Sequence, residues 1–365
     1  MKRLLPVALF VGTLVPGAGF AQSQVMLEGV LDGGIRHDSG GTGPGGVTMG
    51  SGQRLPSRLT FSGIEDMGGG LKASFVLETG FLIDTGQGTA NPAGAANGPL
   101  TFGRTSAVGI GSDDWGYVSL GRQYTPLWAV SAGGVNDPFG ASWLGGIGTI
   151  YNATPRASNS VVYSYGYSAR TMLLPAPRKG LGVAVMYGSP DTFAPAPSRA
   201  GQQLGFNVSY GDGTWWAGYG FHQTRGSNTD ISAAAPVTDQ PRLRQQTLAA
   251  SYEFSFARLH LGLNSAKNDT TVDRRNWHVG ANIPFGVHVV KLVYGRANDR
   301  TAANADFTSF QVGYEYNLSK RSSLYAAYGQ VDNNTNAAQI LTGSLGTYAK
   351  GSTPRSYIAG IKHIF

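Results

Sequence analysis

The sequence predicts an all-β chain that forms a 16-stranded antiparallel transmembrane β-barrel. Three observations predict it: a leader typical of exported proteins, apolar residues that alternate with polar ones over segments of about ten residues, and connections that alternate between short and long. A sheet crosses a bilayer only when it closes on itself, because every backbone N–H and C=O in hydrocarbon needs a partner. A closed barrel is therefore the architecture that these observations indicate together.

The composition narrows the class of protein. Charged residues make up 13% of the 365 residues, whereas soluble domains carry about 25%. The chain has 54 glycines and no cysteine, which excludes a disulfide scaffold, a thiolate nucleophile and a Cys-ligated metal site. With 41% apolar residues and little charge, the chain does not have the composition of a disordered protein.

Residues 1–21 are predicted to be a secretory signal peptide. Lys2 and Arg3 precede an apolar run over residues 4–15, and small residues lead to a cleavage site after Ala21. The run is too short to cross about 30 Å of hydrocarbon as a helix. Residues 22–365 are then the barrel domain, with 26 basic and 21 acidic side chains and a net charge of +5.

Sixteen segments of the mature chain are predicted to be strands. Leu204, Phe206, Val208 and Tyr210, for example, alternate with glycine and polar residues, so that one face is apolar and the other polar. A β-sandwich or a propeller would need two packed faces, which this pattern does not supply. The segments lie near residues 24–37, 54–65, 70–80, 101–112, 115–124, 159–168, 181–189, 202–211, 214–224, 243–254, 256–266, 274–284, 286–297, 306–317, 322–331 and 355–365.

The connections between these segments alternate in length. One series is short, with the stretch 169–180 somewhat longer than the rest, and the other series consists of long polar loops. Short turns on one side and long loops on the other are typical of transmembrane barrels. The last segment ends in Phe365, with Tyr357 and Ile361 on the same face. This end resembles the terminal strand of Gram-negative outer-membrane proteins, which the barrel-assembly machinery recognises.

Six stretches of the sequence match the pattern of one family. They are residues 24–34, 57–75, 102–110, 116–123, 158–163 and 357–365. With these stretches, the mature chain resembles the general porins of β-proteobacteria over essentially its whole length. The resemblance implies a homotrimer in the Gram-negative outer membrane, in contact with membrane lipid and lipopolysaccharide. It also implies a water-filled channel for passive diffusion of small hydrophilic solutes and ions, and not an enzyme.

The resemblance further implies that the third long loop, Tyr124–Ala157, folds into the barrel and constricts the pore. Its acidic residue Asp137 matches the acidic loop tip of the family, and Arg58, Arg104 and Arg156 match the arginines of the facing wall. The alternation of residues in its strand also places Arg58 on the inward face, because its neighbour Leu59 belongs to the outward, apolar face. Charge on the lipid face near the bilayer midplane costs about 2–4 kcal/mol, so an arginine in a strand is expected to point into the lumen.

Several other charged residues are further candidates for the lumen or its rim: Lys72, Glu78, Arg122, Arg36 and Lys362. Three arginines that face one carboxylate give a net positive constriction. Because rings of Arg or Lys favour anions, the sequence predicts a modest anion preference. The preference should weaken as salt screens the charges.

Other functions remain as alternatives. Trp128, Phe139, Trp143 and Tyr151 of the third loop either anchor this loop or form an aromatic path in a substrate-specific channel. The six histidines stand without a second ligand at metal spacing, and no phosphate-binding motif is present, so no metal or cofactor is expected. No serine lies in a nucleophile context. The leader and the scattered basic residues argue against nucleic acid as a partner.

Overall fold

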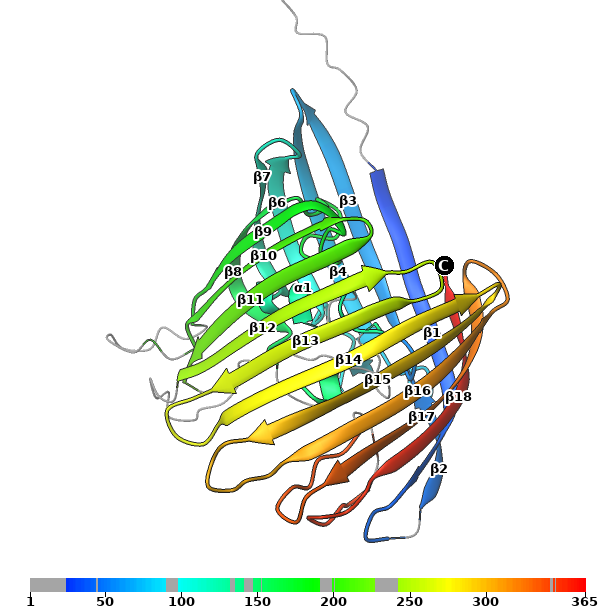
Figure 1. Ribbon diagram of the computed structural model, residues 1–365. Helices are drawn as coiled ribbons and strands as arrows, with labels where there is room; N and C mark the ends of the chain where they lie inside the picture. The colour runs from blue at the N-terminus through cyan, green and yellow to red at the C-terminus, as the bar shows by residue number, and fades with distance from the viewer. Residues whose placement is uncertain are drawn as a thin grey trace, which may run out of the picture.

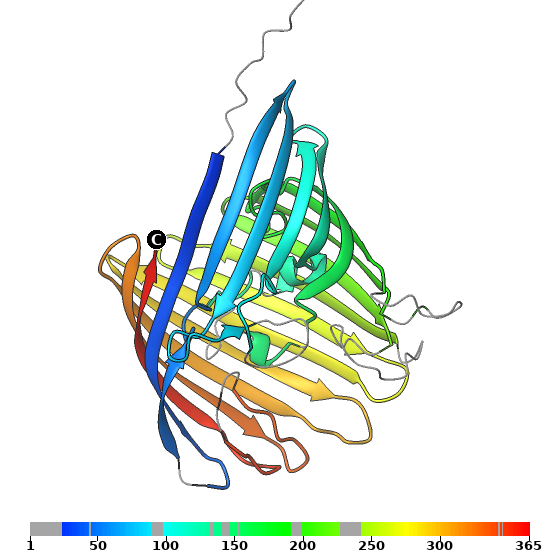
Figure 2. The ribbon, with the colours of Figure 1, turned by 180° about the vertical axis from the view of Figure 1, so that it is seen from behind.

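The structure is a computed structural model that describes residues 24–43, 45–89, 98–131, 135–140, 147–151, 153–190, 199, 201–226, 242–341, 344 and 346–365. The predicted signal peptide, residues 1–21, lies outside the described residues. The described chain forms an antiparallel sheet that closes into a tilted barrel (Figure 1, Figure 2).

The wall of the barrel consists of sixteen long strands, as predicted. In the described chain they are β1 (Gln24–Ser39), β3 (Arg58–Gly68), β4 (Leu71–Phe81), β6 (Thr105–Ser112), β7 (Gly116–Tyr124), β8 (Arg156–Tyr165), β9 (Lys179–Gly188), β10 (Gln203–Asp212), β11 (Trp215–Arg225), β12 (Arg242–Glu253), β13 (Arg258–Lys267), β14 (Asp273–Phe285), β15 (His288–Asp299), β16 (Phe307–Asn317), β17 (Ser322–Asn333) and β18 (Arg355–Ile364). Two short strands, β2 (Gly46–Ser51) and β5 (Gly88–Thr89), and two short helices, α1 (Pro126–Ser131) and η1 (Ile147–Thr149), lie in the loops. None of the helices in the described segments is long and apolar enough to cross a membrane.

The barrel closes between the first and the last strand. β1 pairs with β18 from Val30 opposite Ile364 to Ser39 opposite Arg355. On its other edge, β1 pairs with β3 through residues 24–30 and with β2 through residues 33–38. This closure satisfies the backbone of both terminal strands, as a sheet in lipid requires.

The strand expected near 54–65 begins later, at Arg58, because the chain turns inward between β2 and β3. Gly52 has a φ of +64°, which glycine adopts without a steric penalty. The Asp32 carboxylate then accepts the backbone N–H groups of Arg54 and Leu55, at 3.1 and 2.8 Å. The inward turn carries Arg54 into the lumen, a placement that the strand pattern does not reveal.

The alternation of side chains has the predicted sense. In β10, Leu204 and Tyr210 on the outer face are 41% and 50% exposed, whereas Asn207 and Ser209 on the inner face are buried. Inside the barrel, α1 of the third loop packs against β9 to β12 (Figure 1). The apolar side chains thus face the lipid, and the polar faces surround the third loop.

Candidate pore constriction

A cavity of about 680 Å³ lies inside the barrel between the wall and the third loop. The wall side includes part of β1, the parts of β3, β4, β7 and β8 towards the long loops, and the start of β6 with the residue before it. The loop side comprises both helical turns of the third loop and the chain around them. The charged and aromatic residues that line the cavity include Arg58, Glu78, Arg104, Tyr124, Trp128, Tyr151 and Arg156.

Glu78 is the centre of the charged cluster on the wall. Arg104 Nε donates a hydrogen bond to Glu78 Oε1 at 2.5 Å, and Arg58 Nε lies 3.5 Å from Oε2. The Thr60 hydroxyl donates to the same Oε2 at 3.3 Å. The register explains this grouping, because Glu78 lies opposite Thr60 of β3 on one side and opposite Thr105 of β6 on the other. The sequence indicated Glu78 only as a further lumen candidate.

Tyr124 joins the remaining arginine to this cluster. Its hydroxyl accepts hydrogen bonds from Arg104 Nη2 at 2.8 Å and from Arg156 Nη2 at 2.6 Å. The guanidinium carbon of Arg156 lies 4.3 Å from the Tyr124 ring centroid, within the range of a cation–π interaction. Burial lowers the pKa of Arg104, but Tyr124 and Glu78 outweigh burial and the net pKa is raised. Sequence reasoning missed Tyr124, although its position at the end of β7 marks the start of the loop.

The structure therefore brings Arg58, Arg104 and Arg156 together around Glu78. Three guanidinium groups and one carboxylate give the cluster a net charge of +2. Arg104 and Glu78 are mostly buried, with side-chain exposures of 11% and 13%, and Arg58 is more open at 24%. The cluster is held in place by the strands, because each of its members lies in a wall strand or within one residue of one.

Asp137 does not take part in this cluster. It is 3% exposed and is not among the residues that line the cavity. The loop tip is seated on the opposite wall, where Lys291 Nζ donates to the Pro138 carbonyl at 3.0 Å and Arg54 Nη1 to the Phe139 carbonyl at 2.6 Å. The expectation that Asp137 faces the arginines is thus not met, because these two cations hold the tip elsewhere.

Arg122 lies on the outer face of the barrel and not in the lumen. In the β6–β7 register it is opposite the exposed Ser106, and it is two residues from Leu120, which is 50% exposed. Its Nε donates to the Gly103 carbonyl at 2.7 Å, and its Nη1 to the Ser158 hydroxyl at 2.8 Å. The lumen expectation was wrong because the small residues of this strand blur the alternation.

The other lumen candidates are ion-paired. Lys72 Nζ lies 2.6 Å from Asp113 Oδ2, at the short-turn end of β4. Lys362 Nζ lies 2.6 Å from Glu315 Oε1, and Arg36, 1% exposed, pairs with Asp38 at 2.8 Å. None of these pairs belongs to the arginine cluster.

The aromatic residues of the third loop divide into two groups. Phe139 is buried against the wall at Gly313. The Tyr151 hydroxyl lies 2.7 Å from His278 Nδ1, and burial, with nearby Asp137, raises the pKa of this phenol well above its usual value. Both side chains therefore anchor the loop. Trp128 is half-buried: it packs against the apolar cluster that contains Phe139 and Tyr151, and it also lines the cavity. The fourth aromatic residue, Trp143, lies outside the described residues.

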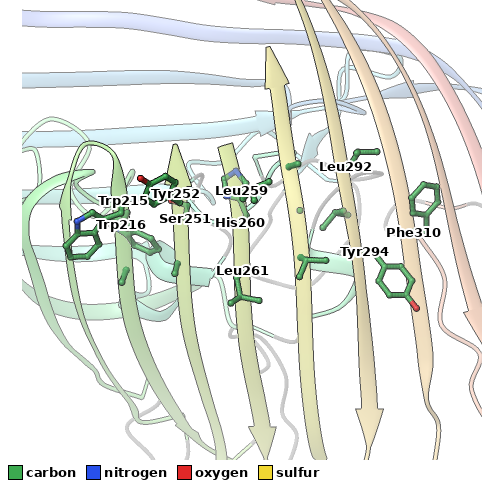
Figure 3. Close-up of a pocket in the computed structure, with 16 residues that line it drawn as sticks. Trp215, Trp216, Ser251, Tyr252, Leu259, His260, Leu261, Leu292, Tyr294 and Phe310 are labelled. Carbon is green, nitrogen blue, oxygen red and sulfur yellow. The ribbon is translucent and has the colours of Figure 1, made fainter. Parts of the chain in front are cut away.

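A second hollow, of about 740 Å³, lies on the outside of the barrel across β11 to β16 (Figure 3). Its outward-facing side chains are apolar or aromatic, among them Leu261, Val279 and Tyr294, which are 42–50% exposed. Because it lies on the lipid face, it is separate from the solute path. In the segments that the structure describes, no group of three or more His, Cys, Asp or Glu side chains is placed to hold a metal ion.

Comparison with known proteins gives one consistent family. Residues 8–336 match a family model described as Gram-negative porin. The chain is 31% identical to outer membrane porin protein 32 of Delftia acidovorans, over 100% of this chain and 99% of that protein. It is 28% identical to an outer membrane porin of Bordetella pertussis, over 91% of this chain and 94% of that protein. Among solved structures it resembles the anion-selective porin from Comamonas acidovorans, with a TM-score of 0.76 and 26% identity over 94% of this chain and 100% of that chain. The chain therefore belongs to the Gram-negative porins, the non-enzymatic channels of the outer membrane.

Proposed function

We propose that this porin forms a water-filled channel for passive diffusion of small hydrophilic solutes and ions, with a modest anion preference. The observation that carries the proposal is the cluster of Arg58, Arg104 and Arg156 around Glu78, with a net charge of +2, on the wall of the inner cavity. Fixed positive charge raises the local concentration of anions and lowers that of cations. The likeness to an anion-selective porin supports the same preference.

The preference is expected to be modest because the cluster is partly neutralised. Glu78 bonds to Arg104 and lies near Arg58, so the field in the lumen is that of about two charges and not three. The lumen is wet, and salt screens charges beyond a Debye length of about 10 Å at 0.1 M. The anion preference should therefore decline as the salt concentration rises.

The test is the reversal potential across a planar bilayer under a salt gradient, for the wild type and for the double variant Arg58→Ala with Arg104→Ala. An anion-selective current that loses its selectivity in the variant would support both the channel and the role of the cluster. An unchanged selectivity would keep the channel and place the selectivity elsewhere. A correctly folded protein without any conductance would refute the channel itself.

We also propose the partners that accompany this function. The chain is expected to assemble as a homotrimer in contact with membrane lipid and lipopolysaccharide, and to reach the assembly machinery through its C-terminal strand. Phe365 lies at the end of that strand, where its backbone N–H donates to the Gly29 carbonyl at 3.1 Å and so completes the closure of the barrel. Analytical ultracentrifugation of the detergent-solubilised protein tests the trimer directly.

A second candidate function is a substrate-specific channel for aromatic anions. Trp128 lines the cavity on the loop side, across from the guanidinium groups of the wall, so a flat carboxylate would meet an aromatic ring and a cation together. Conductance measured with increasing benzoate distinguishes the two functions. Saturable block that Trp128→Ala abolishes favours the specific channel, whereas proportionate conduction favours the general one.

A further inference from the structure

One connection at the short-turn end of the barrel departs from the others. Residues 166–178 connect β8 to β9, whereas the other described connections at this end, such as 213–214 and 286–287, contain two to four residues. Two adjacent antiparallel strands need only about two to five residues to connect. The connection between β8 and β9 is therefore longer than strand pairing requires.

The segment 166–178 packs against the inside of the barrel wall. Tyr167, Leu173 and Ala176 are buried, with exposures of 5%, 1% and 1%, in the same apolar cluster as side chains of α1. The Tyr167 hydroxyl donates a hydrogen bond to Asn207 Oδ1 of β10 at 3.0 Å. Burial of a large apolar side chain to this degree stabilises the fold by about 1.5–3 kcal/mol. The segment is thus a packed part of the interior and not an open turn.

From this anchor the segment reaches a separate part of the wall, formed by β1, β4 and β6. Met172 packs against Val76 of β4 and Ala107 of β6. Arg170 forms an ion pair with Glu28 of β1. Four wall strands, β3, β4, β6 and β7, separate β1 from β8 in the sheet, so this pair crosses part of the lumen and does not join neighbouring strands.

The segment borders the same cavity as the arginine cluster. Thr171, Leu174 and Pro175 line it together with Gly29 and Ile364, which lie at the short-turn end of the barrel. The arginines lie near the long-loop ends of their strands. A solute that passes the arginine cluster therefore meets residues 166–178 before it leaves the barrel on the periplasmic side, where the short turns of such barrels lie.

We propose that residues 166–178 form a second constriction, in series with the arginine cluster and on its periplasmic side, closed by the pair Arg170–Glu28. The inference rests on the proposed channel function. Because its two charges form a pair, this second constriction limits conductance and solute size but adds little to ion selectivity. The arginine cluster determines selectivity, so the two properties are separable by mutation.

Single-cysteine labelling tests the proposal, because the chain contains no cysteine. The variants Thr171→Cys and Leu174→Cys are treated with a bulky methanethiosulfonate reagent during single-channel recording. The matched control is Asp114→Cys, on an exposed turn at the same end of the barrel. We expect labelling to lower the conductance of the first two variants by roughly half and to leave the control unchanged, because only a group in the ion path reduces its cross-section.

The ion pair between Arg170 and Glu28 is tested by a variant that removes both charges, Glu28→Gln with Arg170→Met. We expect a higher conductance than in the wild type and an unchanged reversal potential. Full labelling of Thr171→Cys and Leu174→Cys, verified by mass spectrometry, without a change in conductance would overturn the second constriction while the channel stands. An absence of current from the unlabelled wild type would instead refute the proposed channel function.

Discussion

The charge of the cluster around Glu78 should set the ratio of anion to cation permeability. For an ion that passes at about 8 Å, a unit charge is worth about 0.5 kcal/mol in water and about 0.2 kcal/mol after screening at 0.1 M salt. That energy raises the anion concentration by a factor of about 1.5 and lowers the cation concentration by the same factor. The permeability ratio therefore changes about twofold for each unit charge.

Three proteins with different cluster charges test this relation. The wild-type cluster has a charge of +2 and should give an anion-to-cation permeability ratio of about four. The ratio should be about eight for Glu78→Gln, with a charge of +3, and about one for Arg58→Ala with Arg104→Ala, with a charge of zero. The ratios are obtained from reversal potentials across a bilayer with a potassium chloride gradient of about tenfold, centred near 0.1 M. A repeat at about 1 M salt should bring all three ratios close to one, because the Debye length falls to about 3 Å.

The matched control removes the same two charges from the outer face of the barrel. Arg122→Ala with Arg244→Ala changes the net charge of the chain as much as the lumen variant does. Both side chains lie on the outward face of their strands, together with exposed residues. This control should keep the wild-type ratio. Asp137→Asn should keep it as well, since Asp137 does not line the cavity. A ratio that follows total charge, or that shifts with Asp137→Asn and not with Glu78→Gln, would refute the reasoning.

Three further outcomes are expected. Arg54→Met with Lys291→Met removes both side-chain donors to the carbonyls of the loop tip, and each of these charged hydrogen bonds is worth about 1.5–3 kcal/mol. Single-channel recordings should therefore show a larger and noisier conductance. A quiet, unchanged current would contradict this. The hydrogen bond from Lys72 holds the pKa of Asp113 below its ordinary value of 3.8, so the stability that this pair contributes is present above pH 3.8 and is lost as the pH falls through the lowered pKa. Lys72→Met should return the pKa towards 3.8 in a carboxyl-carbon NMR titration, and an unmoved titration would exclude the pairing. Deletion of Phe365 should reduce the amount of assembled barrel in the outer membrane, measured by heat-modifiable mobility on gels, while equal assembly would remove the proposed role of this residue.

The sequence predicted the wall of this porin closely because lipid imposes a strict pattern on it. The strand expected near 202–211 is β10, Gln203–Asp212, and the one expected near 243–254 is β12, Arg242–Glu253. In both, the apolar face must meet hydrocarbon, so a period of two appears directly in the sequence. The expectation was less accurate near 54–65, where the inward turn depends on backbone contacts to Asp32 and not on periodicity.

The site was less accessible to sequence reasoning because its contacts join distant parts of the chain. Arg58, Arg104 and Arg156 do line one cavity, but Glu78 and Tyr124 determine how they are grouped. These contacts follow from strand register, which a single sequence shows only indirectly.

The position of the loop tip depends on a contact that spans even more of the chain. Lys291 is 153 residues beyond Pro138, whose carbonyl it binds, and nothing near Asp137 in the sequence indicates that contact. Lys291 and Arg54 bind main-chain carbonyls of the tip, and the Phe139 ring packs against the wall at Gly313, so backbone contacts and one buried side chain hold the tip together. The wall cluster depends instead on the identity of Glu78 and its three arginines. We therefore expect selectivity to follow the side chains that strand register fixes and conductance to follow the contacts that hold the loop tip, so that separate variants change one without the other.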